Sequence, residues 1–354
     1  MIYFDNAATT PILDCAREAM QTAPFANPSS SHAEGRKAKE ALEAGRCVIA
    51  ACLGCRPSEV YFTSGATEAC NWMVRCLRRG SDGIMYNSTV HHAVSEAIRA
   101  YSWPNAPRGW PSAVLSLVNN ETGEINDVDA FSRRFRPHRI GIDATAAAGH
   151  LPIDFHALGA DCMAFGGHKF GAPKGIGALI VREGCPIAPM ILGGAQERGM
   201  RGGTTSVPLA SAMAAALSWH TQHMADNAEK IRRVRDQLIF DLAQLGADFI
   251  INFNDGHRQL ADHILSIRFP SVYGASLAAA LSENGIMVST GSACSSGDNA
   301  ASINLMASGL TEQEALETIR FSFDWYNTPA EAAEAARTIS RLLPSLRRGK
   351  SGKN

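Results

Sequence analysis

A histidine and a lysine stand side by side between two glycine-rich turns near the middle of the chain. The apolar run at residues 162–165 predicts a buried strand, and Gly166-Gly167 allows a tight turn at its end. His168 and Lys169 follow this turn. A partly buried lysine can keep a neutral amine that attacks carbonyl groups, although a solvated loop lysine is the commoner interpretation. Other segments of the chain decide between the two.

Ala66 and Thr67 follow a strand predicted at residues 60–63, at the point where a helix begins. The first N–H groups of a helix have no intrahelical partner, so together with a threonine hydroxyl they form a cradle for phosphate. The alternative is a helix start capped by Ser64 or Thr67, and this segment alone favours neither interpretation.

Asp143 follows the strand predicted at residues 140–142, and His91 follows the one at residues 84–86. Ligands of open α/β sheets bind beyond the carboxyl ends of the strands. A carboxylate there can hold a ring nitrogen protonated, and a histidine ring can stack on an aromatic ligand and move protons. Helix N-capping is the favoured alternative for Asp143 taken alone. Metal binding by His91 and its neighbour is disfavoured, because adjacent helical side chains diverge.

Cys294 and Arg320 are two further residues with chemical roles. Cys294 lies in a loop of small residues, where a thiolate is reactive, and an incidental surface cysteine is the alternative. Arg320 lies inside the apolar strand predicted at residues 319–323, where it suits either a substrate carboxylate or an internal ion pair. Together, these segments supply what pyridoxal phosphate needs when it acts on an amino acid.

A sheet must position these residues, and the hydrophobic pattern predicts one. Strand-like runs alternate with helical or loop segments, which indicates an α/β layer with a mostly parallel sheet. These runs lie at residues 60–63, 84–86, 114–118, 140–142, 163–165 and 178–181. A long helix is predicted from Pro208 to about Leu245. Short strands at residues 264–269, 286–289 and 319–323 predict a smaller α+β domain.

Composition excludes several classes of function. The chain has 354 residues and a net charge of −1, so there is no electrostatic case for binding nucleic acid or a membrane surface. No apolar run is long enough to span a bilayer, and no signal peptide is recognisable. Nine scattered cysteines indicate a reducing compartment, so we expect a cytoplasmic protein. No second pair accompanies Cys52 and Cys55 at zinc-site spacing, so we expect no metal.

The motifs described so far, and several others, occur in an order that resembles one known family. They are YFDNAATTP at residues 3–11, NPSS at 27–30, FTSGATE at 62–68, VNNETG at 118–123, IDAT at 142–145, GHK at 167–169, ERGMRGGT at 197–204, GSAC at 291–294 and IRFS at 319–322. Each motif is modest alone, but their shared order is specific. The chain resembles a cysteine desulfurase of the NifS/IscS type, in the class V aminotransferase family.

This resemblance implies an activity and a set of functional residues. The activity is conversion of L-cysteine to L-alanine with transfer of sulfur to Cys294 as a persulfide, for iron–sulfur clusters or thiolated nucleosides. Lys169 binds pyridoxal phosphate covalently and moves the α-proton, and His91 stacks on the ring. The other cofactor-binding residues implied are Ala66, Thr67, Asn120, Asp143 and His168, with Thr204 from the second subunit of a homodimer. Asn27, Asn120 and Arg320 are implied to bind the substrate.

The resemblance also implies a fold and a partner. We expect the pyridoxal-phosphate-dependent transferase fold of the aspartate aminotransferase type. Residues 13–245 form the large cofactor-binding domain, and residues 1–12 and 246–354 form the small domain that carries the cysteine loop. The long loop of Cys294 resembles the family branch that hands sulfur to a partner protein, such as an iron–sulfur scaffold.

Three departures from the family pattern keep alternatives open. Gly166 replaces the usual serine, which removes a phosphate ligand worth about 1 kcal/mol. Ala146 replaces the usual glutamine, and the segment between His91 and Asn120 is shorter by about twenty residues. A selenocysteine lyase or another class V aminotransferase is one alternative, although aminotransferases need no thiol like Cys294. A catalytically weak paralogue acting as a binding subunit is the other.

Overall fold

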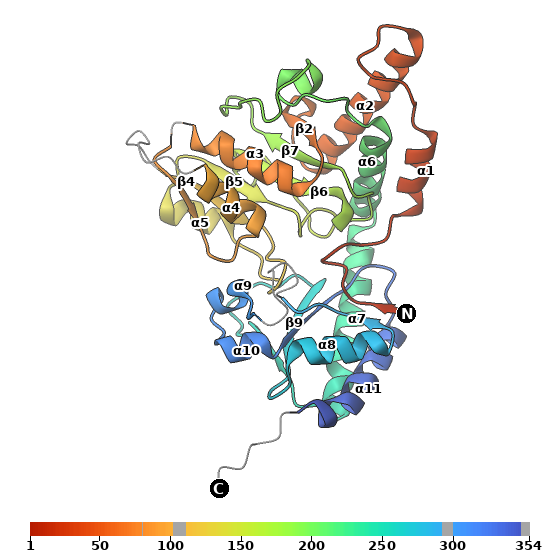
Figure 1. Cartoon of the computed structure of the whole chain (residues 1–354), viewed down its shortest axis with the longest axis vertical. Helices are drawn as coiled ribbons and strands as arrows, with labels where there is room; N and C mark the ends of the chain where they lie inside the picture. The colour runs from red at the N-terminus through yellow and green to blue at the C-terminus, as the bar shows by residue number, and fades with distance from the viewer. Residues whose placement is uncertain (80, 102–110, 292–299, 348–354) are drawn as a thin grey trace. The chain divides into compact units, whose positions relative to one another are not determined.

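The structure is a computed structural model that describes residues 1–79, 81–101, 111–291 and 300–347 (Figure 1). Cys294 lies outside the described residues. The chain divides into two compact units. Unit 1 comprises Met1–Ala8, Asn119–Ile125 and Ala225–Asn354, and unit 2 comprises Thr9–Val118 and Asn126–Met224. The segment with Asn120 therefore belongs with unit 1, and which unit holds a cofactor stays a prediction.

Unit 2 is built on a six-stranded sheet with the order β2-β7-β6-β5-β4-β3. Its strands are β2 (Val60–Thr63), β3 (Ile84–Tyr86), β4 (Ser112–Ser116), β5 (Ile140–Asp143), β6 (Cys162–Gly166) and β7 (Gly177–Val181). Only β7 runs antiparallel to its neighbours, so the sheet is mostly parallel as predicted. β2, β4, β5, β6 and β7 are buried along their whole length, as expected for strands covered on both faces.

Helices cover this sheet and bury its apolar side chains. They are α1 (Asp14–Thr22), α2 (Ala33–Cys52), α3 (Ala66–Arg78), α4 (His92–Ala100), α5 (Val128–Phe135) and α6 (Val207–Gln222), with short 3-10 turns η1 (Pro57–Glu59), η2 (Gly167–Lys169) and η3 (Gln196–Gly199). Helix α3 packs across β6 and β7 (Figure 1). Trp72 and Met73 of α3 are fully buried there, in one cluster with Ala164 and Leu179.

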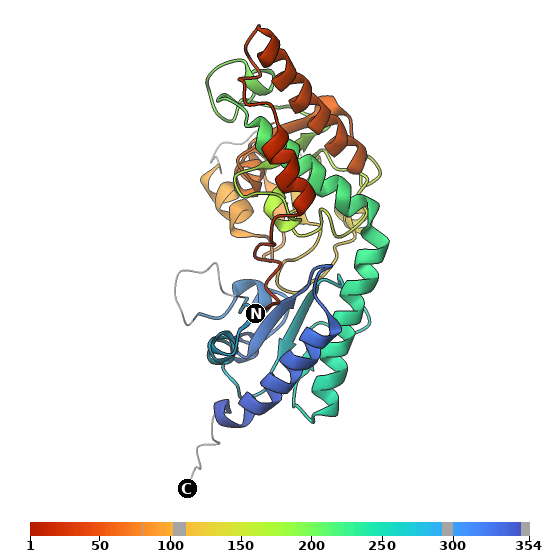
Figure 2. The same cartoon turned by 90° about the vertical axis from the view of Figure 1, so that its right-hand side faces the viewer.

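Unit 1 has a three-stranded antiparallel sheet with the order β11-β9-β8 and a separate parallel pair, β1 and β10. The strands are β1 (Ile2–Tyr3), β8 (Ile250–Ile251), β9 (Ile264–Arg268), β10 (Ile286–Met287) and β11 (Thr318–Ser322). The helices are α7 (Met224–Gln244), α8 (Gly274–Glu283), α9 (Ile303–Ala307), α10 (Glu312–Leu316) and α11 (Pro329–Leu346), with α7 and α11 lying along the sheet in Figure 2. Leu238 of α7, Ile267 of β9, Phe321 of β11 and Ile339 of α11 share one core.

The prediction of one long helix from Pro208 to about Leu245 is wrong in one respect. The segment is two helices, α6 and α7, separated at His223, whose backbone leaves the helical region at φ −108° and ψ 12°. The Nδ1 atom of His223 lies 2.8 Å from the carbonyl oxygen of Trp219, the same oxygen that accepts the His223 N–H. A side chain that competes for helical carbonyls in this way favours a break.

Candidate active site

Four parallel strands of unit 2 lead to the residues that the sequence singled out. β2 leads to the start of α3, β3 leads to His91, β5 ends at Asp143, and β6 leads to His168 and Lys169. Because β2, β3, β5 and β6 point the same way, their carboxyl ends lie at one edge of the sheet. Ligands of open α/β sheets bind at this edge.

The start of α3 has no side-chain cap. Gly65 is the N-cap residue, and neither Ser64 nor Thr67 accepts a hydrogen bond there, so the capping alternative is wrong. Gly65 has φ 156° and ψ 179°, a conformation that is essentially confined to glycine. The first N–H groups of the helix, at Ala66 and Thr67, are therefore left for an anion.

An ion pair fastens the first turn of α3 to the segment that carries Thr204. Arg201 donates from Nε to Oε1 of Glu68 at 2.9 Å and from Nη2 to Oε2 at 3.1 Å. Burial acts to raise the pKa of Glu68, but hydrogen bonds from Arg201 and Ser64 lower it overall. Glu68 is thus ionised at neutral pH, and its charge is paired with Arg201 of the same chain. Thr204 itself is exposed.

Asp143 is buried at the end of β5, and its Oδ1 accepts the N–H of Thr145 at 3.0 Å. Turns rather than a helix follow, so the N-cap alternative is wrong. Burial, together with the charge of Asp143 and a hydrogen bond to it, raises the pKa of Cys70 on α3. Thr145 Oγ1 is a buried atom without a hydrogen-bond partner among the described residues. A buried carboxyl group and a buried hydroxyl without a partner therefore lie together at this strand end.

His91 caps α4, because its Nδ1 accepts the N–H of Ala93 at 3.0 Å. This bond places the proton of the neutral ring on Nε2. Burial lowers the pKa of His91, and the charges of Lys169 and His92 lower it further, whereas Asp143 acts to raise it. Asp143 and Lys169 are thus close enough to His91 for their charges to act on it.

The backbone fixes His168 and Lys169 in the turn η2. The carbonyl oxygen of His168 accepts the Thr10 N–H at 3.1 Å, and that of Lys169 lies 3.2 Å from Nε2 of His150. Burial and the charges of Lys169 and Lys174 lower the pKa of His168 to about 4. The imidazole is therefore neutral at physiological pH, and Lys169 is half-buried.

The residues at this edge fit a phosphorylated pyridine aldehyde such as pyridoxal phosphate. Uncapped N–H groups and a neutral imidazole suit its phosphate, a buried carboxylate suits a ring nitrogen, and an amine suits the aldehyde. Gly166 lies against the cradle, since a Cβ added there would be 3.1 Å from the backbone nitrogen of Ala66. The missing serine therefore coincides with a close approach of β6 to α3.

In unit 1, Arg320 is buried and already has partners. Its Nη2 donates to Oδ1 of Asp5 at 2.7 Å and its Nη1 donates to the carbonyl oxygen of Asn120 at 2.8 Å. The internal ion pair that the sequence left open is therefore present. Arg320 Nε is buried with no hydrogen-bond partner among the described residues, so the guanidinium keeps one donor beyond this pair.

Glu121, next to Asn120, is a buried carboxylate that sequence reasoning missed. It accepts hydrogen bonds from Ser302 Oγ at 2.5 Å and from Asn304 Nδ2 at 2.7 Å. A Cβ added to Gly291 would lie 2.2 Å from Glu121 Oε2. Glu121 thus touches residues on both sides of the segment 292–299, which lies outside the described residues and contains Cys294. The only signal was an acidic residue inside the VNNETG motif.

Asn27 of unit 2 is exposed, and its side chain is engaged locally. Its Oδ1 accepts the N–H of Ser29 at 2.9 Å, which closes a turn. The structure therefore brings Ala66, Asp143, His91, His168 and Lys169 to one edge of the sheet in unit 2. Asn120 and Arg320 are brought together in unit 1.

Comparisons with known proteins identify the family. The model of the aminotransferase class-V family matches residues 2–102 and 112–334. The chain belongs to this family. It is 34% identical to the IscS-like cysteine desulfurase of Mycobacterium tuberculosis over 98% of both chains. It is 31% identical to the cysteine desulfurase IscS of Methanosarcina thermophila over 98% of this chain and 93% of that protein.

Two solved structures agree with this assignment. A NifS-like protein with 30% identity aligns with a TM-score of 0.87 over 98% of this chain and all of that chain. SspA in complex with cysteine, at 29% identity, aligns with a TM-score of 0.72 over 93% of this chain and all of that chain. The family is a pyridoxal-phosphate-dependent enzyme family, and the predicted fold is confirmed.

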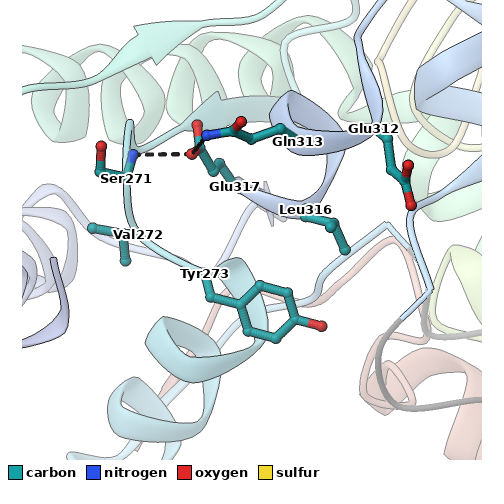
Figure 3. Close-up of a pocket in the computed structure, with 7 residues that line it drawn as sticks. All are labelled: Ser271, Val272, Tyr273, Glu312, Gln313, Leu316 and Glu317. Carbon is teal, nitrogen blue, oxygen red and sulfur yellow. Dashed lines mark hydrogen bonds between the residues drawn. The ribbon is translucent and has the colours of Figure 1, made fainter. Parts of the chain in front are cut away.

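A hollow in unit 1 lies apart from the predicted site residues. A hollow of about 290 Å³ in unit 1 is lined by Ser271, Val272, Tyr273, Glu312, Gln313, Leu316 and Glu317 (Figure 3). None of the predicted site residues is among them, and Glu317 already accepts hydrogen bonds from Ser271 and Gln313. Within the described ranges no helix is long and apolar enough to cross a membrane, and no group of three His, Cys, Asp or Glu side chains is arranged to hold a metal ion.

The Cys52–Cys55 pair is not built for redox chemistry. Both thiols are free. Burial and the nearby charges of Glu59 and Asp154 raise the pKa of Cys55 to about 12, so its reactive thiolate is scarce.

Proposed function

We propose that the chain is a pyridoxal-phosphate-dependent cysteine desulfurase that converts L-cysteine to L-alanine and transfers the sulfur to Cys294 as a persulfide. One observation supports this most strongly. The charges of Asp143 and Lys169 both act on the pKa of His91, at the edge of the sheet to which the uncapped start of α3 also belongs. An acid, a base and an amine at a phosphate cradle are what amino-acid chemistry on this cofactor requires.

The proposed roles follow from the contacts of each residue. When bound, the cofactor supplies an electron sink for the carbon that loses a proton. Lys169 would hold the aldehyde carbon of the cofactor and carry the α-proton of the substrate, and the Asp143 carboxylate would pair with the ring nitrogen. His91 has its Nδ1 engaged by Ala93, so it presents Nε2–H for stacking and proton transfer. His168 is neutral, so it bonds to phosphate by hydrogen bonding rather than by charge.

Substrate recognition is proposed for Arg320, Asn120 and Asn27. Arg320 is fixed by Asp5 and by the carbonyl oxygen of Asn120, and its free Nε suits a carboxylate oxygen. Asp5 neutralises part of its charge, so the site combines orientation with moderate attraction.

A homodimer and a sulfur-acceptor protein are further parts of the proposal. Thr204 is exposed on a segment held by the Arg201–Glu68 ion pair, which suits a contribution to a second subunit. Ile191 and Leu192, nearby in sequence, are 40% and 85% exposed, which leaves apolar surface for a second subunit to cover. We also propose a cytoplasmic location from the scattered cysteines; cell fractionation tests it.

The activity is tested by following alanine and sulfide from L-cysteine with added pyridoxal phosphate. We expect both products from the wild type with a reducing agent present. Cys294→Ala should lose sulfide release while keeping the visible absorbance of bound cofactor. Normal turnover in that variant would remove Cys294 from the mechanism. Activity with selenocysteine alone would favour a selenocysteine lyase, and no cofactor absorbance would favour the weak paralogue.

A further inference from the structure

Three cysteines of unit 2 lie together in a place that the proposed reaction does not use. Cys76 is on α3, Cys162 begins β6, and Cys185 follows β7. The sulfur atoms of Cys162 and Cys185 are 3.8 Å apart. Cys76 and Cys162 are fully buried, whereas Cys185 is partly exposed at the edge of the same cluster.

The strand pairing explains why two of these sulfurs meet. β6 and β7 are antiparallel, with Cys162 opposite Val181, and a turn then brings the Cys185 N–H to within 2.9 Å of the Arg182 carbonyl oxygen. The segment is held from both sides. Trp72 Nε1 donates to the Ala188 carbonyl oxygen at 2.8 Å, and Arg182 Nε donates to that of Ala160 at 2.7 Å. The close approach is therefore a fixed feature of the packing.

The two thiols differ in reactivity in a complementary way. A hydrogen bond from Cys162 lowers the pKa of Cys185, and Arg139 and Arg182 help, against burial and Asp161. Hydrogen bonds with Cys185 and Cys76, followed by burial, raise the pKa of Cys162. The partly exposed sulfur is thus the readier of the two to lose its proton. An accessible thiolate beside a second thiol is the arrangement of oxidant-sensitive cysteines.

We propose that Cys162 and Cys185 form a reversible disulfide in response to oxidants of the hydroperoxide class. The Cys185 thiolate attacks the peroxide, so an S–O bond forms, the O–O bond breaks, and the leaving oxide takes a proton to become water or an alcohol. The Cys162 sulfur then attacks the sulfenic acid, so the S–S bond forms and the S–O bond breaks. Its proton leaves with the hydroxyl group as water. The two thiols lose two electrons and the peroxide gains them.

The bridge closes a loop from residue 162 to residue 185. This loop contains His168 and Lys169, so the site would respond to oxidants in the same hairpin that carries the proposed cofactor lysine. The sulfurs must move from 3.8 Å to a bond length of about 2.0 Å, which the partly exposed Cys185 segment can provide. The inference does not depend on the proposed function, because it needs no cofactor and no cysteine substrate.

Digestion with trypsin identifies the bridge unambiguously, because it places the two cysteines in different peptides with no other cysteine in either. Cys162 falls in residues 140–169 and Cys185 in residues 183–198. The full-length Cys294→Ser protein is treated with a small excess of hydrogen peroxide, alkylated, digested and analysed by mass spectrometry. We expect these two peptides joined by a disulfide and released by dithiothreitol. Without peroxide, both cysteines should be alkylated.

Matched variants distinguish this bridge from general oxidation. Cys162→Ala should prevent the bridge and leave Cys185 trapped by a sulfenic-acid reagent, while Cys47→Ser, which removes an exposed cysteine outside the cluster, should change neither. A bridge between Cys76 and Cys162 instead would overturn the assignment. Oxidation of Cys185 straight to sulfinic acid with Cys162 present would also overturn it. So would a Cys185 that the sulfenic-acid reagent labels no faster than it labels Cys47.

Discussion

Two regions of the molecule differ in how far their polar groups are paired within the chain. At the sheet edge of unit 2, α3 begins without a cap and Thr145 Oγ1 is buried without a partner among the described residues. In unit 1, Glu121 is bonded by Ser302 and Asn304, and Arg320 pairs with Asp5 and keeps only its Nε without a partner among the described residues. Unpaired buried groups cost folding free energy and are kept where a ligand completes them. This contrast agrees with our proposal that unit 2 binds the cofactor and that unit 1 presents an arginine held by its own chain.

We expect the largest effect on activity from Lys169→Ala, which changes the sheet edge of unit 2. The variant loses the proposed cofactor-binding amine and proton carrier, so turnover of L-cysteine should fall by at least about 1,000-fold. Alanine production measures it. Lys174→Ala is the matched control, since this exposed lysine lies five residues along the same turn, and it should stay within about twofold of the wild type. A Lys169→Ala protein that still turns over would place the reactive amine elsewhere.

Glu121→Ala should give the largest loss of stability in unit 1. Removing the buried carboxylate leaves Ser302 and Asn304 without their acceptor, so the free energy of unfolding should fall by about 3 kcal/mol. Urea denaturation measures it. Glu124→Ala removes a more exposed acid directly after this motif, 3.9 Å from Arg258, and should cost less than about 1 kcal/mol. Equal losses in the two variants would show that Glu121 does not hold this region.

Arg320 and Asp5 can be separated by pairing their variants. Both Arg320→Ala and Asp5→Ala break one ion pair, so each should lower the unfolding free energy by about 1–3 kcal/mol. Only Arg320→Ala removes the proposed carboxylate ligand, so only this variant should raise the KM for L-cysteine, by about 100-fold. Steady-state kinetics on both proteins decide. A similar KM increase in Asp5→Ala would reduce Arg320 to a structural ion pair.

Gly166 tests the phosphate cradle with a smaller effect. Gly166→Ala adds only a Cβ that crowds the Ala66 nitrogen at 3.1 Å, so cofactor affinity should fall a few-fold. Gly166→Ser adds the same carbon and a hydroxyl, which should bind about fivefold tighter than the alanine variant, or about 1 kcal/mol. Fluorescence titration with pyridoxal phosphate measures both. Equal affinities of the two variants would place the phosphate away from residue 166.

The smallest expected effect is a pH dependence at His168. Its pKa is lowered to about 4 in the folded chain, against about 6.5 when unfolded, so the unfolded state binds its proton first as the pH falls. Stability from this group is therefore complete above pH 6.5 and is lost progressively down to about pH 4. Urea midpoints between pH 7 and pH 4.5 should fall less in His168→Gln than in the wild type. Parallel slopes would contradict the lowered pKa.

The sequence predicted the sheet of unit 2 closely. β2 and β3 have the predicted bounds, and β5, β6 and β7 differ by a residue or so, because buried parallel strands are nearly continuous apolar runs. β4 begins two residues earlier than predicted, and the break at His223 was missed, because helical periodicity continues across it. Such a break depends on one side chain's hydrogen bond rather than on the pattern.

The site was predictable only where residue type and strand end coincide. Lys169, Asp143 and His91 lie at or after the end of a strand, so the sheet topology places them at one edge. The partner of Arg320 is 315 residues away in sequence, and Glu121 meets Asn304 across 183 residues. No local pattern specifies these pairs. The meeting of Cys162 and Cys185 likewise depends on the register of β6 against β7 and on the turn that follows.

The central claim is that Lys169 holds pyridoxal phosphate in unit 2, and one measurement tests it most directly. The purified chain is incubated with the cofactor, reduced with borohydride, digested with trypsin and sequenced by mass spectrometry. We expect the pyridoxyl group on Lys169, with cleavage after that residue blocked so that residues 140–174 remain one peptide. A pyridoxyl group on another lysine, or none in the protein, would contradict the account.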